Sequence, residues 1–262
     1  MNHLRNIFFA VSILALMSGA VAQVQSQDCG TVTDYDGNTY KTVMIGRQCW
    51  MAENLRTTHY ADGTAIRLGS DTSCRKFYRY YPNGRSGNVA RYGYLYNWAA
   101  VMKGDAPSDA NPSGVQGICP NGWHVPSNAE FMQLLDYVYS QPQYHSDGCS
   151  GEKNEAEASC IAKALATQTG WKSSSYAGDV GNNPSTNNAT GFGMQPAGAY
   201  FLGYESFGNY AYLYSASKNS GFSFVHPSYQ AVLCYVILYS RSSVVCNVCL
   251  MGHGMSVRCL RD

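Results

Sequence analysis

The residues with the most reactive chemistry in this chain are its ten cysteines. Cys246 and Cys249 are separated by two residues, a spacing that lets two sulfur atoms meet one metal ion or each other. One hypothesis is therefore a cysteine-dependent oxidoreductase or protein-modifying enzyme. The opposing hypothesis is that the cysteines form structural disulfides, up to five of them, because an even number of cysteines is typical of exported proteins. Cys149 and Cys160 are close enough in sequence for a local bridge. The other cysteines are Cys29, Cys49, Cys74, Cys119, Cys234 and Cys259, and their pairing is open.

Oxygen ligands for a cation are concentrated in one short segment, Asp34-Tyr-Asp-Gly-Asn38. Its alternating carboxylate and amide oxygens resemble the start of a calcium loop. Position 12 of such a loop needs a bidentate acid. Here that position is Ile45, whose side chain cannot bind a cation. The segment is therefore interpreted as an Asp-Gly hairpin turn, with calcium at residues 34–38 as the alternative.

General acid and base side chains occur without the partners that catalysis needs. His124 and His253 have no nucleophile beside them in a known motif, and the G-x-S-x-G, H-E-x-x-H and phosphate-loop patterns are absent. Glu53 and Asn54 can hydrogen-bond a sugar, but their setting among turns and apolar residues favours a structural role. The sequence thus predicts no catalytic residue, no metal ligand and no cofactor.

Tyrosine is abundant, with 21 in the chain, and it is concentrated near residues 77–85 and 200–214. Tyrosine beside Ser, Asn and Gly offers flat apolar area with polar edges at a low cost in conformational entropy, as in antibody paratopes. Core packing and strand pairing explain such residues equally well. The candidate ligand-binding residues are Tyr78, Tyr80, Tyr81, Tyr200, Tyr204, Tyr210 and Tyr212.

Residues 1–22 have the pattern of a signal peptide. Arg5 supplies a positive charge, and the apolar run at 7–17 is shorter than the roughly 20 residues that span a bilayer. We expect a mature chain of residues 23–262 that forms one domain, is secreted or displayed at the cell surface, and has no membrane span after cleavage. Without Arg5, Lys plus Arg falls from 18 to 17 and equals Asp plus Glu at 17, which argues against nucleic acid as a partner.

Local signals for secondary structure indicate an α+β fold. Asp36-Gly37 between strand-forming residues predicts a hairpin within 31–55. Ser127-x-x-Glu130 is a capping box, and apolar residues that follow at i, i+3, i+4 and i+7 predict a helix with one buried face. A second main helix is predicted over 155–167, before Gly170.

The remaining segments are assigned from composition and alternation. Residues 63–91 are interpreted as a long irregular loop, 96–101 as a short helix and 172–191 as a solvated loop. Aromatic and β-branched residues after 192, including 222–225 and 235–239, predict several strands. We expect the N- and C-terminal strands to share one sheet.

Six motifs run in one order across nearly the whole mature chain. Together they resemble the Fibrobacter succinogenes major paralogous domain, a family of exported bacterial modules. This chain differs from the family by its extra cysteines, so its loops are expected to be unusually cross-linked. The motifs are Thr33-Asp-Tyr-Asp-Gly-Asn-Thr-Tyr40, Trp50-Met-Ala-Glu-Asn-Leu55, Tyr94-Leu-Tyr-Asn-Trp-Ala-Ala-Val101, Cys119-Pro-Asn-Gly-Trp-His-Val-Pro-Ser127, Pro196-Ala-Gly198 and Ser256-Val-Arg-Cys259.

The resemblance implies a mixed, loop-rich single domain similar to the C-type-lectin-like and formylglycine-generating (sulfatase-modifying-factor-like) group. It also implies a disulfide between Cys119 and Cys259. The copper-linked cysteine pair of formylglycine-generating enzymes does not align with Cys246 and Cys249, and Gln195-Pro196-Ala197 lacks the second oxygen ligand of a C-type-lectin sugar site.

Three functions compete on this basis. The first is a non-catalytic adhesion or carbohydrate-binding module at the cell surface, which recognises an extracellular glycan or a surface protein through the tyrosine-rich loops. The second is a structural subunit of a surface assembly. The third is the cysteine-dependent enzyme. The aromatic, uncharged loops and the absence of a catalytic motif favour the first over the enzyme. The sequence does not separate the binding module from the structural subunit.

Overall fold

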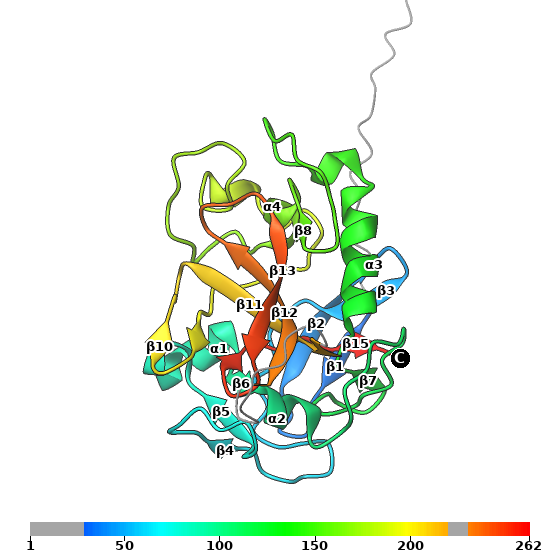
Figure 1. Cartoon of the computed structure of the whole chain (residues 1–262), viewed down its shortest axis with the longest axis vertical. Helices are drawn as coiled ribbons and strands as arrows, with labels where there is room; N and C mark the ends of the chain where they lie inside the picture. The colour runs from blue at the N-terminus through cyan, green and yellow to red at the C-terminus, as the bar shows by residue number, and fades with distance from the viewer. Residues whose placement is uncertain (1–28, 220–229) are drawn as a thin grey trace, which may run out of the picture.

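The computed structural model describes residues 29–219 and 230–262. In these residues three small β-sheets are joined by loops and short helices (Figure 1). Strand predominates over helix, and both occur in mixed order along the chain, as expected for an α+β fold. The predicted signal peptide at 1–22 and the predicted strand at 222–225 lie outside the described residues. No helix in the described part has the length and apolar character needed to cross a membrane.

The first sheet joins the two ends of the described chain. β2 and β3 follow the Asp-Gly turn predicted from the sequence. In that turn Gly37 takes a φ of 81°. β15 pairs with β3 on one side and β7 on the other, so the prediction that N- and C-terminal strands share a sheet is confirmed. The strands are β1 (Thr31–Thr33), β2 (Thr39–Ile45), β3 (Gln48–Met51), β7 (Trp123–His124) and β15 (Leu260–Arg261), in the order β1-β2-β3-β15-β7.

The second sheet collects six very short strands from distant segments. It includes residues 63–91, whose assignment as a wholly irregular loop is wrong. The segment forms two strands, the helix α1 (Val89–Tyr92) and 3-10 turns at Pro82–Gly84 and Ser86–Asn88, because tertiary pairing with β6 overrides weak local signals. The strands are β4 (Arg67–Leu68), β5 (Tyr78–Tyr80), β6 (Leu95–Asn97), β9 (Ala199–Tyr200), β10 (Tyr204–Glu205) and β14 (Gly254–Met255), in the order β10-β9-β14-β6-β5-β4.

The third sheet contains the longest strands, which lie at the centre of Figure 1. The predicted strand at 235–239 is confirmed within β12, and nearly every residue of β11 is buried. The strands are β8 (Glu157–Ala158), β11 (Tyr210–Lys218), β12 (Ala231–Leu238) and β13 (Val244–Leu250), in the order β11-β12-β13-β8.

The helix predicted after Ser127 is α3 (Asn128–Tyr139). The capping box forms as predicted. The Ser127 hydroxyl accepts from the Glu130 N–H at 3.2 Å, and the Glu130 carboxylate accepts from the Ser127 N–H at 2.9 Å. Phe131 on the buried face packs its ring 5.1 Å from Trp50 and 4.2 Å from Tyr235. α3 therefore links the first sheet to the third.

The second predicted main helix is wrong in extent. Only α4 (Ala162–Leu165) is helical within 155–167. The preceding residues form β8, which pairs with β13. Cys160 takes a φ of 69°, a value that a right-handed helix does not allow. Pairing with the third sheet and the bridge to Cys149 outweigh the local helix propensity.

The loop at 172–191 has no strand, as predicted, and its only regular element is a 3-10 turn at Pro184–Thr186. It is less solvated than expected, because Val180 and Asn187 are buried. The Lys163 ammonium donates to backbone carbonyls of residues 179, 182 and 183. Burial lowers the pKa of Lys163 below its usual value. Lys163 therefore holds this loop against α4.

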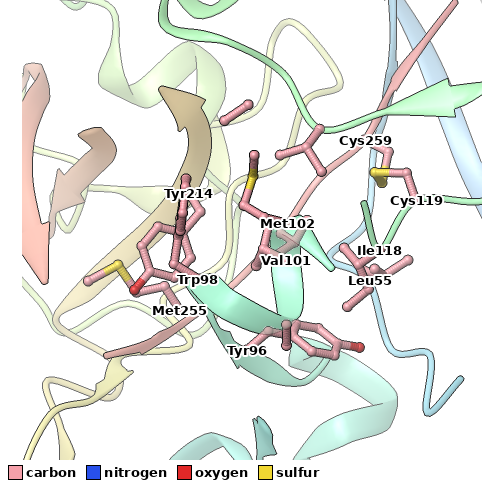
Figure 2. Close-up of a cluster of buried hydrophobic side chains, with 14 of the residues drawn as sticks. Leu55, Tyr96, Trp98, Val101, Met102, Ile118, Cys119, Tyr214, Met255 and Cys259 are labelled. Carbon is pink, nitrogen blue, oxygen red and sulfur yellow. A yellow bond between two sulfur atoms is a disulfide. The ribbon is translucent and has the colours of Figure 1, made fainter. Parts of the chain in front are cut away.

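The main core surrounds the short helix α2 (Trp98–Met102), which matches the helix predicted over 96–101 with a shift of its start. Asn97 accepts from the Ala100 N–H at 3.1 Å, which caps the helix. Figure 2 shows Trp98 and Met102 among buried side chains from the second and third sheets, including Tyr214. The Trp98 indole N–H donates to the Ser215 carbonyl at 3.0 Å, so α2 is anchored to β11.

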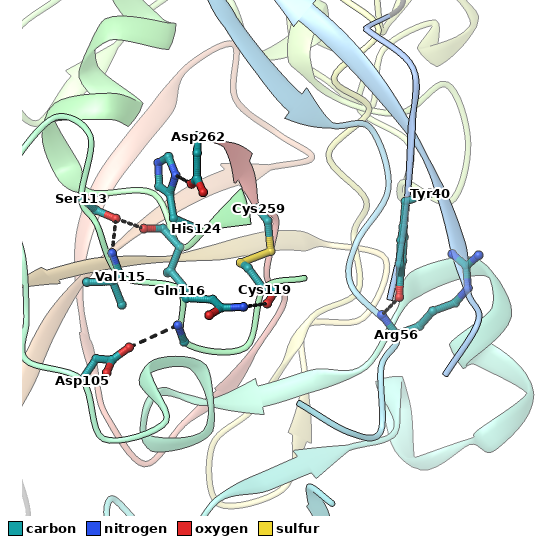
Figure 3. The surroundings of a disulfide bond; sticks show 12 residues. Tyr40, Arg56, Asp105, Ser113, Val115, Gln116, Cys119, His124, Cys259 and Asp262 are labelled. Carbon is teal, nitrogen blue, oxygen red and sulfur yellow. Dashed lines mark hydrogen bonds and ion pairs between the residues drawn. A yellow bond between two sulfur atoms is a disulfide. The ribbon is translucent and has the colours of Figure 1, made fainter. Parts of the chain in front are cut away.

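Four disulfides cross-link the described residues. The expected Cys119–Cys259 bridge is present (Figure 3) and closes a sequence separation of 140 residues. A loop of that size is worth about 4–5 kcal/mol in the chain-entropy account. The expected local Cys149–Cys160 bridge is also present. Four disulfides in one chain indicate an oxidising compartment. The other bridges are Cys29–Cys49 and Cys234–Cys249.

Candidate functional site

The two tyrosine-bearing segments predicted from the sequence meet in space. The 3-10 turn at Pro82–Gly84, which follows β5, packs against β9 and β10 (Figure 1). Gly84 has a φ of 66°, and a Cβ atom there would lie 2.9 Å from Cε2 of Tyr204. Glycine is therefore required both for the turn and for the close approach of the Tyr204 ring.

A row of tyrosine rings runs beneath this contact. The Tyr78 and Tyr80 centroids are 6.2 Å apart, Tyr80 stacks on Tyr200 at 4.2 Å, and Tyr200 meets Tyr204 edge-on at 5.0 Å. These separations are typical of favourable aromatic pairs. The row begins in β5, crosses the second sheet and ends on the β9–β10 hairpin.

Burial separates the residues of this row into two groups. Tyr78 and Tyr80 belong to the core, and Tyr80 has no exposed area, so its ring is not available to a ligand in solvent. Tyr81 and Tyr200 are half-buried, while Tyr204 is 41% exposed. The hairpin tip adds Leu202, which is 93% exposed.

We define the recognition surface as Tyr81, Tyr94, Tyr200, Leu202 and Tyr204. Tyr94 joins it because its ring lies 5.8 Å from Tyr81. Burial, then the neighbouring Tyr200 and Tyr81, raise the pKa of Tyr204. Tyr94 and Leu202 were not singled out from the sequence. The signal that could have identified Leu202 is the sequence Tyr-Phe-Leu-Gly-Tyr at 200–204, in which Gly between aromatic residues predicts a hairpin turn.

A cation borders the recognition surface. The Arg79 guanidinium covers the Tyr94 ring at 5.1 Å, a cation–π contact. Arg79 comes from β5, between the buried rings of Tyr78 and Tyr80. No sequence pattern singled out this arginine, which contacts the Tyr94 ring beside Tyr81.

The hydroxyl groups of this surface differ from those of the tyrosines that have no exposed area. Every described tyrosine with no exposed area has a bonded hydroxyl; for example, Tyr80 donates to the Asp71 carbonyl at 2.7 Å and Tyr96 to the Thr57 carbonyl at 2.8 Å. Such bonding is the rule for buried polar groups. Within the described residues, no hydrogen bond is made by the hydroxyls of Tyr81, Tyr94 or Tyr204. Three aromatic side chains on one surface thus keep a free donor and acceptor.

Tyr210 and Tyr212 form a separate stack on β11. Their centroids are 5.5 Å apart with an interplanar angle of 11°, and Phe201 meets Tyr212 edge-on at 5.9 Å. Tyr212 is buried and Tyr210 half-buried. Burial raises the pKa of Tyr212 to about 12. The seven predicted tyrosines therefore lie in two groups and do not form one site.

The segment at 34–38 has the hydrogen bonding of a structural turn. The Asp34 carboxylate accepts from the Asn38 N–H and side-chain amide, both at 2.9 Å, and from the Tyr40 hydroxyl at 2.5 Å. The Asp36 carboxylate instead accepts from Thr58 and faces His59 Nδ1 at 2.5 Å. The two carboxylates therefore point to different internal partners, which supports the hairpin interpretation over the calcium alternative.

The sulfur atoms of Cys246 and Cys249 do not pair. Cys249 forms a disulfide with Cys234, whereas Cys246 is a free thiol. Residues three apart on a strand project to opposite faces, so the two sulfur atoms of β13 cannot meet. The Cys246 thiol lies 3.6 Å from Asn128 Oδ1, and burial raises its pKa above the usual range. A raised pKa disfavours the thiolate that redox chemistry needs.

His124 occupies a buried position between two carboxylates. Its Nε2 lies 2.7 Å from Glu130 Oε1, and its Nδ1 lies 2.7 Å from Asp262 Oδ1 (Figure 3). Burial lowers the pKa of His124, but hydrogen bonds to the two carboxylates outweigh it, so the net pKa is raised. A cleft of about 470 Å³ adjoins the group. Both ring nitrogens are occupied, so this imidazole has no lone pair for a substrate.

The acid and amide residues considered for sugar binding also bond internally. Asn54 is buried, donates to the Tyr92 carbonyl at 2.9 Å and accepts from Arg258 Nε at 3.0 Å. The Glu53 carboxylate accepts from the Lys41 N–H at 2.8 Å. Burial of the whole Arg258 side chain lowers its pKa to about 9. The structural interpretation of Asn54 fits these contacts.

His253 lies apart from these groups. Its ring is 4.4 Å from Phe201, its Nδ1 is buried without a hydrogen-bond partner in the described residues, and burial lowers its pKa to about 4. No group of three or more His, Cys, Asp or Glu side chains in the described part of the chain is arranged to hold a metal ion.

Comparison with known proteins identifies one relationship. The model of the Fibrobacter succinogenes major domain matches residues 43–261, and five of the six sequence motifs lie inside that match. Neither the curated proteins nor the solved structures include a significant match to the chain. Because the match covers most of its length, the chain belongs to the Fibrobacter succinogenes major domain family.

Proposed function

We propose that this protein is an exported, non-catalytic binding module that recognises a glycan or a surface protein through the recognition surface. The observation that carries the proposal is the set of free hydroxyls on Tyr81, Tyr94 and Tyr204, placed together by two segments far apart in sequence. Aromatic faces pack on the C–H faces of sugars and on apolar side chains, and the hydroxyls add hydrogen bonds.

The scaffold supports this role. Tyr204 and Leu202 lie on a hairpin whose base is fixed by Gly198, where a Cβ atom would come within 2.3 Å of the Glu205 carbonyl oxygen. A rigid hairpin loses little conformational entropy on binding. The four disulfides fit an extracellular setting, which agrees with the signal-peptide pattern of residues 1–22. We further propose that the α+β arrangement is of the C-type-lectin-like type.

A binding screen with matched variants tests the proposal. The purified protein is applied to arrays of glycans and extracellular-matrix proteins, with Tyr81→Ala/Tyr204→Ala as the test variant and Tyr176→Ala as the control. Tyr176 is 76% exposed and lies in the 172–191 loop, so it reports the loss of an exposed tyrosine elsewhere. Tyr80 is unsuitable as a test position because it is buried.

The expected result is reproducible binding that the double variant weakens about tenfold or more and that Tyr176→Ala leaves unchanged. Equal binding by all three proteins would remove the recognition surface from the proposal. If the protein binds nothing on the arrays, the result would instead favour a role as a structural subunit of a surface assembly.

A further inference from the structure

A second surface feature lies at the β4 end of the same sheet. It is a groove of about 380 Å³ lined mainly by residues of β4, β5 and the loop between them. That volume is within the usual range for small-ligand sites. We call this feature the basic groove. Its lining residues are Ala65, Arg67, Arg75, Lys76, Phe77 and Tyr78.

The lining contains three cationic side chains and no carboxylate. Lys76 has one distant acid, with 4.0 Å between Nζ and Asp71 Oδ2. Within the described residues neither Arg67 nor Arg75 has an ion-pair partner for its guanidinium. The basic groove thus concentrates uncompensated positive charge on a chain that is otherwise nearly neutral.

A buried amide fixes the loop that carries two of these cations. Asn97 has no exposed area, and its side-chain amide donates to the Ser73 carbonyl at 2.5 Å and the Lys76 carbonyl at 2.7 Å. Its carbonyl oxygen accepts from the Tyr78 N–H at 3.0 Å. The Ser73 hydroxyl in turn accepts from the N–H groups of Arg75 and Lys76. The backbone beneath the groove is therefore held in place before any ligand binds.

Aromatic rings form the apolar part of the groove. Phe77 is 37% exposed and braced edge-on by Tyr60 at 6.1 Å. Tyr78 is the first ring of the tyrosine row that leads through Tyr80 and Tyr200 to the recognition surface. The two surface features therefore lie on the same sheet and are linked by one row of packed tyrosine rings.

We propose that the basic groove binds the carboxylate of a uronic acid unit in an acidic polysaccharide. The planar guanidinium fork matches a carboxylate with two parallel hydrogen bonds, and the exposed part of the Phe77 ring offers a surface for the sugar. A nucleic acid is disfavoured because the whole chain carries almost no basic excess, which phosphate binding along a strand requires. This inference rests on the proposed recognition function and names the ligand class for it.

The experiment uses one polymer with and without its charge. Polygalacturonate is compared with fully methyl-esterified polygalacturonate by calorimetry at low and at physiological salt. The test variant is Arg67→Gln/Arg75→Gln, and the control is Arg47→Gln/Arg241→Gln, which removes two exposed arginines that do not line the groove. Dextran sulfate serves as a polyanion without uronic acid.

We expect the protein to bind polygalacturonate. Esterification and the test variant should each weaken this binding about tenfold or more, which corresponds to the loss of at least one charge-assisted hydrogen bond. The control variant should bind as tightly as the wild type. Equal loss in the control, or equal affinity for dextran sulfate, would reduce the groove to nonspecific charge attraction and overturn the inference.

The two proposals fail separately. Binding to neutral glycans that depends on Tyr204 and not on Arg67 and Arg75 retains the proposed function and overturns the groove inference. Binding to polygalacturonate that depends on Arg67 and Arg75 and not on Tyr204 supports the groove and moves recognition away from the tyrosine surface. No binding to either polymer, or to the arrays, overturns both.

Discussion

The His124 cluster and the recognition surface both contain several polar side chains, but they use them differently. At His124, the ring is buried and both of its nitrogens are bonded to carboxylates of the same chain. At the recognition surface, the hydroxyls of Tyr81, Tyr94 and Tyr204 have no bond within the described residues, and Tyr204 is exposed. Residue types that can do chemistry therefore indicate a site only when their polar atoms are not already satisfied.

The largest effect is expected from breaking the His124 cluster. Glu130→Ala removes the partner of a buried imidazole and one half of the capping box, and should lower the free energy of unfolding by about 3–5 kcal/mol. Denaturant unfolding measures this loss. Asp136→Ala, on the exposed face of α3, is the control and should cost about 1 kcal/mol or less. Equal effects of the two changes would contradict the description of His124 as a structural group.

A second experiment separates core tyrosines from surface tyrosines. Tyr80 is fully buried, so Tyr80→Ala empties a core site and should lower the free energy of unfolding by about 3 kcal/mol. Tyr204→Ala should change it by about 1 kcal/mol or less and act on binding instead. Thermal unfolding and the array screen together measure both. A large loss of stability with Tyr204→Ala would place that ring in the core.

The pH dependence of stability should reveal the charge on His124. Its pKa is raised in the folded protein, so its contribution is fully present below the unfolded pKa of about 6.5 and is lost as pH rises through the folded pKa. His124→Gln should therefore reduce stability more at pH 5 than at pH 9. The exposed His145 provides the control His145→Gln. A difference between wild type and His124→Gln that stays constant over this range would argue against a charged His124.

The smallest effect is expected at the Asp36 turn. Burial raises the pKa of Asp36, but hydrogen bonds from Thr58, His59 and Thr57 outweigh it and lower the pKa to about 2. Its contribution is therefore present above the unfolded pKa of about 3.9 and is lost as pH falls through the lower folded value. Because the residue lies at the protein surface, with 20% of its side chain exposed, Asp36→Asn should cost about 1 kcal/mol at pH 7. Acid titration followed by circular dichroism compares the wild type with Asp36→Asn. If the two proteins unfold at the same pH, these hydrogen bonds contribute nothing measurable to stability.

Features set by neighbours in sequence could be predicted from the residues, whereas most features set by distant partners could not. The exceptions are the Cys119–Cys259 bridge, which the family resemblance implied, and the sheet shared by the N- and C-terminal strands. The capping box at Ser127 and the turn at Gly37 depend on residues a few positions apart. The burial of Tyr80 depends on Tyr200, and the Cys234–Cys249 bridge depends on the register of β12 and β13. The basic groove depends on hydrogen bonds from Asn97 to the carbonyls of Ser73 and Lys76, more than 20 residues away, and no local sequence pattern predicts these bonds.

The same distinction explains the tyrosine-rich segments. Their composition predicted candidate ligand-binding residues, but alternation along β5 decides which side chain faces inward. Tyr78 and Tyr80 are buried, whereas Arg79 between them is only half-buried and reaches Tyr94. The sequence alone could not say which face of so short a strand packs on the core.

The disulfides also determine how the molecule responds to mechanical tension. A pull applied between Cys29 and Cys259 passes through the Cys29–Cys49 bridge, along the backbone from 49 to 119, and out through the Cys119–Cys259 bridge. Residues 120–258, with the third sheet and the β9–β10 hairpin, lie outside that covalent load path. Tyr204 on the β9–β10 hairpin therefore lies outside the load path, whereas Tyr81 and Tyr94 lie on it, so tension along this path would pull one half of the recognition surface away from the other.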